Sequence, residues 1–248
     1  MSDRGGHKDP HRERGYRQLV RSHLVTDRLV VQQTDLGLYT SHPVSAEAKE
    51  AVIFQRAQLE AYIRSHPGFL QSLQPLPLDP LAPPMVRRML QAGQSAQVGP
   101  MAAVAGAMAE AVGQALRPIS EEVIVENGGD IFLHIRRPVT VAIFAGASPL
   151  SLKIGLQINP DSGVSAVCTS SGTVGHSLSF GRADAACVLG SDCALADAAA
   201  TAVGNRVRAA ADIPTAIHWA QRIPGVLGLL IVVEEKMGAW GAVEVMPL

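Results

Sequence analysis

The segment from Val164 to Asn205 constrains the fold more than any other part of this sequence. It contains a strand of small and β-branched residues that ends at Cys168, a loop rich in Gly, Ser and Thr over 169–181, and a second strand over 184–189. An Ala-rich helix follows near Ser191. Because such a loop offers hydroxyl groups and accessible backbone N–H groups, the segment favours a site for a phosphorylated ligand.

The remaining chain alternates strand and helix patterns without an internal repeat or a clear domain boundary. We therefore predict one α+β domain over 16–248, a largely antiparallel mixed sheet covered by helices, behind a disordered tail over 1–15. The predicted helices lie over 45–65, 84–90, 99–116, 191–211 and 213–221, and 69–84 is an extended, proline-rich connector. The predicted strands lie over 16–21, 24–33, 38–40, 123–125, 131–133, 139–145, 153–158, 164–168, 184–189 and 227–233, with a final hairpin over 237–246.

Composition excludes several classes of protein. The net charge of −1 gives no long-range field for nucleic acid, and no apolar run reaches the roughly 18 residues that a membrane span needs. The start of the chain lacks the apolar region of a secretory signal, and three cysteines are too few for a disulfide framework, so we expect a cytoplasmic protein. The helix over 99–116 is thin enough for a close helix contact, within the chain or across a homodimer.

A candidate metal pair lies in the Ala-rich helix. Asp197 and Thr201 are four residues apart and therefore share one helix face. Their oxygens suit Mg²⁺, with the remaining ligands supplied by carbonyls, waters and phosphates. The plainer interpretation is that Asp197 faces water and that the Thr201 hydroxyl bonds back to a carbonyl.

Two glycine-containing segments are candidates for cofactor binding. Asn127, Gly128, Gly129 and Asp130 form either a tight hairpin turn or a place where bare backbone approaches a phosphate. The loop lacks the P-loop lysine, yet it can still make polar contacts with a nucleotide. Its candidate binding residues are Thr169, Ser170, Ser171 and Gly172.

Three residues are candidates for catalysis. Cys168 ends a strand beside the loop, where N–H groups aimed at its sulfur would favour a nucleophilic thiolate; the alternative is a small buried side chain. Glu110 is the only charge in its helix and faces either solvent or the site. His176 is either a proton-transfer group or a structural hydrogen-bonding residue.

The order of these motifs resembles the ApbE superfamily of flavin transferases, which cut FAD and attach FMN to a Thr or Ser. The resemblance covers about 97–204 and is closest to a compact, uncharacterised ApbE-like family of bacteria and archaea. It is carried by VAGAMAE at 104–110, NGGD at 127–130, TSSG at 169–172 and ADAAATA at 196–202.

By position, the resemblance implies that Asp197 and Thr201 bind Mg²⁺. It likewise implies that Gly106, the turn at 127–130 and the loop at 169–172 hold a flavin nucleotide such as FAD or FMN. The chain departs from the pattern at Ala105, where the family has lysine, at Glu110, where it has aspartate, and in lacking the His-Ile-Ile-Asp-Pro stretch after the loop.

Three functions follow as hypotheses. The first is a Mg²⁺-dependent flavin- or nucleotide-binding protein with FMN transferase or FAD pyrophosphatase chemistry. The second is a sulfur-transfer protein that uses Cys168. The third is a non-catalytic binding or assembly protein on the same scaffold.

Overall fold

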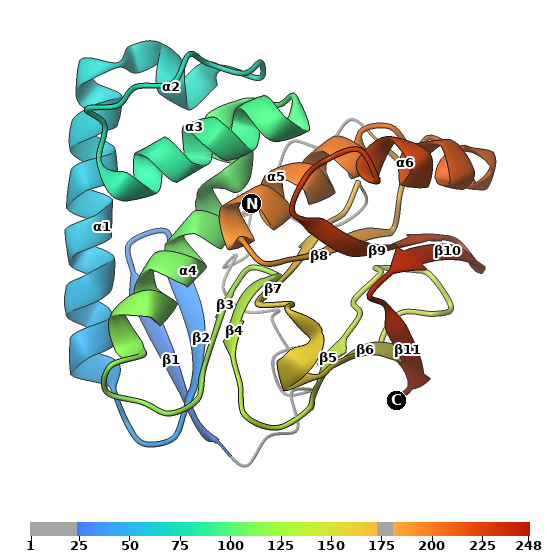
Figure 1. Cartoon of the computed structure of the whole chain (residues 1–248), viewed down its shortest axis with the longest axis horizontal. Coiled ribbons are helices and arrows are strands. Elements are labelled where there is room, and N and C mark those ends of the chain that lie inside the picture. The colour runs from blue at the N-terminus through green and yellow to red at the C-terminus, as the bar shows by residue number, and fades with distance from the viewer. Residues whose placement is uncertain (1–23, 173–180) are drawn as a thin grey trace, which may run out of the picture.

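An antiparallel sheet of eight strands forms the centre of the molecule (Figure 1). The computed structural model describes residues 24–172 and 181–248. The strand order is β1-β2-β3-β4-β7-β8-β9-β10. The strands are β1 (Val25–Val31), β2 (Thr34–Thr40), β3 (Val123–Asn127), β4 (Asp130–His134), β7 (Ala166–Ser170), β8 (Ala185–Gly190), β9 (Val226–Val233) and β10 (Lys236–Gly241).

A second, three-stranded sheet packs against one face of the first. Its order is β11-β6-β5, and both pairings are antiparallel. The strands are β5 (Val139–Ala142), β6 (Ile154–Ile158) and β11 (Glu244–Pro247). Apolar side chains of both sheets form one buried cluster, in which Ile124 and Val167 of the large sheet meet Leu156 of the small one.

Helices cover the other face of the large sheet (Figure 1). They are α1 (Ser45–Ser65), α2 (Pro67–Gln71), α3 (Pro84–Ala96), α4 (Val104–Leu116), α5 (Cys193–Gly204) and α6 (Ile213–Ala220), with a 3₁₀ turn η2 (Pro100–Ala103) ahead of α4 and two more at η3 (Pro160–Ser162) and η4 (Ala210–Asp212). No helix in the described ranges is both long and apolar enough to cross a membrane.

The alternation of side chains along the strands decides which residues meet the helices. Val125, Phe132 and Cys168 belong to the helix-facing cluster, whereas their neighbours Ile124 and Val167 face the small sheet. Cα partners across β4 and β7 place Asp130 opposite Cys168. The start of β4 and the end of β7 therefore lie beneath α5, which packs on both β7 and β8.

The predicted α+β class with a largely antiparallel sheet is confirmed, and α1 spans the residues expected of it. Two expectations about the strands are wrong. The strands near 139–145 and 153–158 build the small sheet rather than extend the large one. The final hairpin does not form, because the chain turns at Gly241 with φ of 79° and β11 pairs with β6 instead of β10.

The helix over 191–211 is shorter than expected and ends at Gly204. Beyond Gly204 the backbone hydrogen bonds with another segment of the chain: the amide of Arg182 donates to the Val207 carbonyl at 2.7 Å. The connector over 69–84 contains the end of α2 before it becomes extended. The predicted tail over 1–15, the strand over 16–21 and most of the loop after Gly172 lie outside the described residues.

Candidate functional site

The candidate site is built on an unusually close contact between α4 and α5. The Gly106 amide of α4 donates to Asp197 Oδ2 of α5 at 2.8 Å, and the Cys193 amide of α5 donates to Glu110 Oε2 of α4 at 2.8 Å. Each helix thus supplies a carboxylate to a backbone N–H group of the other. A Cβ atom at Gly106 would lie 2.2 Å from the Cys193 carbonyl oxygen, so only glycine allows this approach.

Arg88 of α3 closes the Cys193 end of this contact. Its Nη2 lies 2.6 Å from Glu110 Oε1 and 2.7 Å from Asp192 Oδ2. Asp192 in turn caps α5 by accepting the Leu195 amide at 2.8 Å. Burial lowers the pKa of Arg88, but hydrogen bonds and the charges of Glu110 and Asp192 outweigh it and hold that pKa above its usual range.

Glu110 therefore lies neither in solvent nor at a free catalytic position. Its side chain is 6% exposed, one oxygen pairs with Arg88, and the other accepts the Cys193 amide. A carboxylate with both oxygens engaged in this way stabilises the helix contact. The geometry supports a structural role for Glu110 rather than the predicted catalytic one.

Asp130 is a buried carboxylate whose hydrogen bonding is incomplete within the described chain. It is buried at the start of β4, and its Oδ1 has no hydrogen-bond partner within the described chain. Burial raises its pKa far above the usual range, and the neighbouring charges of Asp197 and Glu126 raise it further. Hydrogen bonds from the Cys168 thiol and the Thr169 amide oppose this rise without cancelling it.

Asp197 faces Asp130 from α5. Burial raises the pKa of Asp197 to about 7, against hydrogen bonds from the Gly106 and Ala105 amides. Thr201 lies one turn further along α5 and is half-buried, and no hydrogen bond of its hydroxyl is recorded within the described ranges. The prediction that Asp197 faces water does not hold, because its carboxylate points into the α4 contact.

The glycine turn is tied to the same place. The side-chain amide of Asn127 donates to the Ala105 carbonyl at 3.1 Å, which fixes the turn against the start of α4. Gly128 and Gly129 have φ of 71° and 108°, as the hairpin interpretation requires. The Gly129 amide donates to Glu126 Oε1 at 2.9 Å, so this N–H group has a partner in the chain itself.

The described part of the hydroxyl-rich loop is split between the two faces of the sheet. Thr169 hydrogen bonds with Cys187, in the cluster between the sheets, while Ser170 has the same strand parity as Cys168 and is buried, with no partner for its Oγ in the described chain. Ser171 is half-buried and Gly172 is exposed. His176 lies outside the described residues.

Cys168 is a poor nucleophile in this environment. It is fully buried, its Sγ lies 3.6 Å from Cys193 Sγ, and it donates toward the Cys193 carbonyl. Burial raises the pKa of its thiol well above the usual range, and neighbouring acids raise it further. A reactive thiolate needs the opposite shift, so the geometry gives no support to the expected catalytic role.

The oxygens of the carboxylate pair are the kind of ligand that a hard cation prefers. Burial raises the pKa of both acids, Asp197 raises that of Asp130 further, and Oδ1 of Asp130 has no partner in the described chain. Both acids would ionise beside a positive ion. Among the described residues no three His, Cys, Asp or Glu side chains are arranged to hold a metal. A cation held by Asp130 and Asp197 would need its remaining ligands from hydroxyls, backbone carbonyls, water or ligand phosphates.

Sequence reasoning missed Arg88, Asp192 and Glu126. Asp192 was detectable, because Asp two residues after Gly190 and directly before an Ala-rich helix is a strong N-cap signal. Arg88 gave no such signal, since 104 residues separate it from Asp192. Glu126 gives no separate signal, because it directly precedes the turn at Asn127–Asp130.

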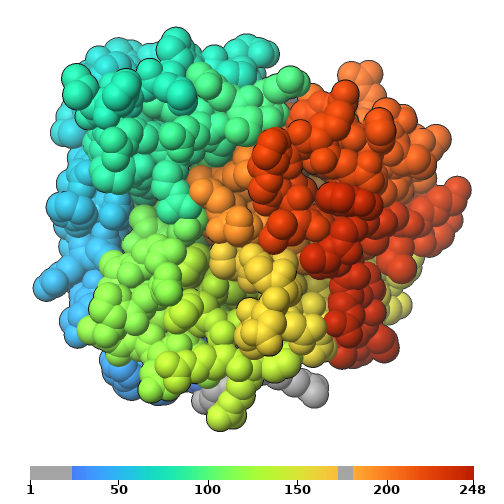
Figure 2. Space-filling view, viewed as in Figure 1, coloured from blue at the N-terminus to red at the C-terminus, as the bar shows by residue number. Residues whose placement is uncertain are grey.

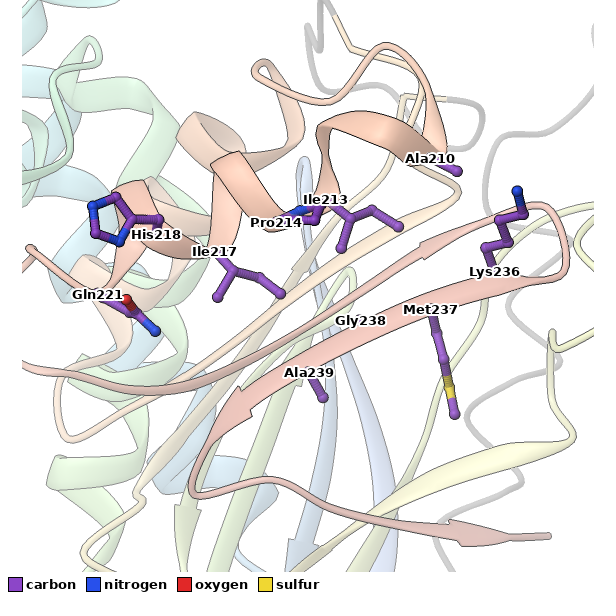
Figure 3. A pocket seen from close by; sticks show the side chains of 10 residues that line it. All are labelled: Ala210, Ile213, Pro214, Ile217, His218, Gln221, Lys236, Met237, Gly238 and Ala239. Atoms are coloured by element: carbon purple, nitrogen blue, oxygen red, sulfur yellow. The ribbon is translucent and has the colours of Figure 1, made fainter.

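A wide hollow of about 610 Å³ lies elsewhere, between α6 and β10 (Figure 3). Ile213, Ile217 and Gly238 form its walls, with His218 and Lys236 toward its ends. None of the expected site residues lines it. In the view of Figure 2, α5 reaches the surface between α3 and the C-terminal strands. Asp130 and Asp197 are 7% and 9% exposed, so the carboxylate pair is buried.

Comparisons with known proteins agree with this architecture. The chain is 46% identical over 198 residues to a UPF0280 protein of Methanosarcina barkeri, covering 79% of this chain and 78% of the relative. It is 38% identical over 222 residues to a UPF0280 protein of Methanocaldococcus jannaschii, covering 87% and 90%.

Solved structures extend the likeness to the flavin transferases. The flavinyl transferase ApbE of Pseudomonas stutzeri, in its apo form, superposes with a TM-score of 0.57 at 14% identity, covering 88% of this chain and 94% of that one. The flavin transferase ApbE of Vibrio cholerae superposes with a TM-score of 0.52, also at 14% identity, covering 88% and 96%. At this identity the likeness establishes the ApbE-like fold alone.

A sequence model of the family described as "AbpE bacteria" matches residues 17–223, which is most of the chain. This protein therefore belongs to that ApbE-like family, together with the uncharacterised UPF0280 proteins.

Proposed function

We propose that this protein binds a divalent cation together with a phosphorylated flavin or nucleotide at Asp130, Asp197 and Thr201. One observation carries the proposal: Asp130 has a buried oxygen with no partner among the described residues, and it faces a second buried carboxylate. Native structures rarely leave such an oxygen unsatisfied without a functional reason. The negative charges that destabilise this pair in an apolar contact would bind a cation such as Mg²⁺.

The chain's own residues would divide the task by position. Asp197 would be held in orientation by the Gly106 and Ala105 amides, and Asp130 by the Thr169 amide. The turn at 127–129 and the loop from Ser170 to Gly172 would supply hydroxyls and accessible backbone to the ligand. When bound, Mg²⁺ would neutralise a diphosphate and polarise it for attack.

The ligand class is argued from the relatives. The solved structures of similar fold that are compared above are titled flavin transferases. Separately, the turn, the loop and the two helix motifs of this chain follow in the order that its sequence resemblance to that superfamily rests on. Ala105 stands where the resemblance leads one to expect lysine, so we propose binding as the retained property. FAD cleavage or FMN transfer is the reaction class to be tested on it.

The sulfur-transfer alternative has weaker support. It needs an accessible Cys168 thiolate, whereas the thiol is buried and burial raises its pKa. A non-catalytic assembly protein is the second candidate, and it would be favoured by an absence of any cation or nucleotide binding.

The test is calorimetric titration of the purified protein with Mg²⁺, FAD and ADP, each nucleotide with Mg²⁺ and with EDTA. We expect nucleotide binding that depends on Mg²⁺ in the wild type and is lost in Asp197→Asn, because the variant removes one of two charged ligands. Asp161→Asn, an exposed acid on the 3₁₀ turn after β6, is the matched control and should bind as the wild type does.

Product analysis by liquid chromatography then asks whether FAD is converted to AMP and FMN. Binding that is equal with and without Mg²⁺, or that survives Asp197→Asn, would refute the proposed site. Reaction of native Cys168 with a thiol reagent at neutral pH, faster than that of Cys187, would instead revive the thiol alternative.

A further inference from the structure

The Arg88 network is the best-defined charged cluster that the proposed function leaves unexplained. Three elements meet in it: α3 supplies Arg88, α4 supplies Glu110, and the start of α5 supplies Asp192 and the Cys193 amide. Other ion pairs in the described chain are more local, such as Arg56 with Glu60 within α1. A half-buried guanidinium that bridges two carboxylates from different elements restricts how those elements move.

The network and the candidate site are linked through the two helices. Glu110 lies one turn beyond Gly106 on α4, and Cys193 lies one turn before Asp197 on α5. The two hydrogen bonds between α4 and α5 are therefore separated by a single turn of each helix. A shift of the α5 start relative to Glu110 would move Asp197 away from Gly106 and from Asp130.

We infer that Arg88 is a positioning residue that, through Glu110 and Asp192, holds the start of α5 so that Asp197 stays opposite Asp130. Arg88 touches neither carboxylate of the candidate site, and it acts by fixing the helix that carries one of them. The inference rests on the proposed function only for its consequence in cation binding. Its structural core is the coupling of Arg88 to the Gly106–Asp197 hydrogen bond.

Arg88 supplies the positive charge between two carboxylates at the start of α5. Without Arg88, the buried Glu110 carboxylate and the Asp192 carboxylate would both lie at the start of α5 with no cation between them. Glu110 would then gain by moving toward water, and its hydrogen bond to the Cys193 amide would open. Lysine can bridge both carboxylates as a point charge, although without the fixed fork of arginine.

The first measurement is amide hydrogen exchange, followed by NMR, on Arg88→Gln, Arg88→Lys and the control Arg56→Gln. In Arg88→Gln we expect exchange at Cys193 and at Gly106 to be about tenfold faster relative to amides of β3, such as Val125, which report global unfolding. A purely structural role would speed all of these amides alike. Arg88→Lys should restore most of the protection, and Arg56→Gln should leave the ratio unchanged.

The second measurement is Mg²⁺ titration of the same variants. Because loss of a group that orients a metal ligand costs about 10–100-fold in affinity, we expect Arg88→Gln to weaken Mg²⁺ binding by that factor and Arg56→Gln to weaken it less than about twofold. Wild-type Mg²⁺ affinity in Arg88→Gln, or wild-type protection at Gly106, would overturn the inference.

The two proposals fail in different ways. A wild-type protein that binds no Mg²⁺ refutes the proposed function, while the exchange ratio at Gly106 still decides the role of Arg88. If Arg88→Gln does not fold, Asp192→Asn replaces it, because this variant keeps the Arg88–Glu110 pair and an oxygen for the Leu195 amide. It should show a smaller rise in exchange at Gly106, and no rise would count against the inference.

Discussion

Glu110 and Asp130 are both buried carboxylates beside α5, yet their surroundings are opposite. Glu110 has a guanidinium at 2.6 Å and a backbone N–H group at 2.8 Å, so both of its oxygens are engaged. Asp130 has a second carboxylate as its charged neighbour, and one of its oxygens has no partner in the described chain. Burial alone therefore does not show whether an acid is paired with groups of the described chain.

The two acids differ in the groups that surround them. Glu110 pairs with a guanidinium and a backbone N–H group, whereas Asp130 faces a second acid and has one oxygen without a partner in the described chain. The two acids lie close together. Asp130 faces Asp197, whose partner Gly106 lies one turn before Glu110 on α4. This juxtaposition makes the comparison testable by substitution.

The largest expected effect comes from removing the supported carboxylate. Glu110→Ala leaves the Cys193 amide without its acceptor and Arg88 with Asp192 alone, so we expect the free energy of unfolding to fall by about 3 kcal/mol. Urea denaturation measures it. Glu60→Ala is the control, because it breaks a partly exposed pair within α1 and should cost less than about 1 kcal/mol.

A loss in Glu110→Ala no greater than that of Glu60→Ala would mean that the network around Glu110 contributes little. The contrast between the two carboxylates would then rest on the orphaned oxygen of Asp130 alone.

A smaller effect is expected where the two helices touch. Gly106→Ala would place a methyl group 2.2 Å from the Cys193 carbonyl oxygen and 2.8 Å from Asp197 Cβ, so α4 and α5 must separate. We expect a loss of about 2 kcal/mol by urea denaturation, together with weaker Mg²⁺ binding. Gly68→Ala, with nothing within 4 Å of the added carbon, should leave stability unchanged or raise it slightly. Equal behaviour of the two variants would show that α5 can move without cost.

The sequence predicted where helices, strands and turns lie better than it predicted which strands pair with each other. The helix over 45–65 follows from one apolar stripe bounded by Ser45 and Pro67, and the turn at Asn127–Asp130 follows from glycines that tolerate positive φ. Alternation in 139–145 and 153–158 identified strands but gave no information on which sheet they join. Both sheets bury the same kinds of side chain, so the pattern is the same for either.

The candidate site divides in the same way. The order of its motifs selected Asp130 and Asp197, which the structure brings together. Local position made Glu110 and Cys168 candidates for catalysis, since one is the lone charge of its helix and the other is a cysteine at a strand end. These patterns look the same whether or not the side chain is paired in the fold. Only the fold shows that Arg88, distant in sequence, neutralises Glu110, and that the sheet and α5 bury Cys168.

The smallest effect on stability is expected at the unsupported carboxylate, and it is the sharpest test of the comparison. Asp130→Asn keeps the shape of the side chain and removes the ionisable group that faces Asp197. We expect the free energy of unfolding in EDTA to change by less than about 1 kcal/mol or to rise, because burial and Asp197 already disfavour the ionised form of Asp130. Mg²⁺ binding, measured by calorimetry, should fall strongly in the same variant. A large loss of stability would place Asp130 with Glu110 among the structural acids, since it would mean that its charge already has a stabilising partner within the folded chain.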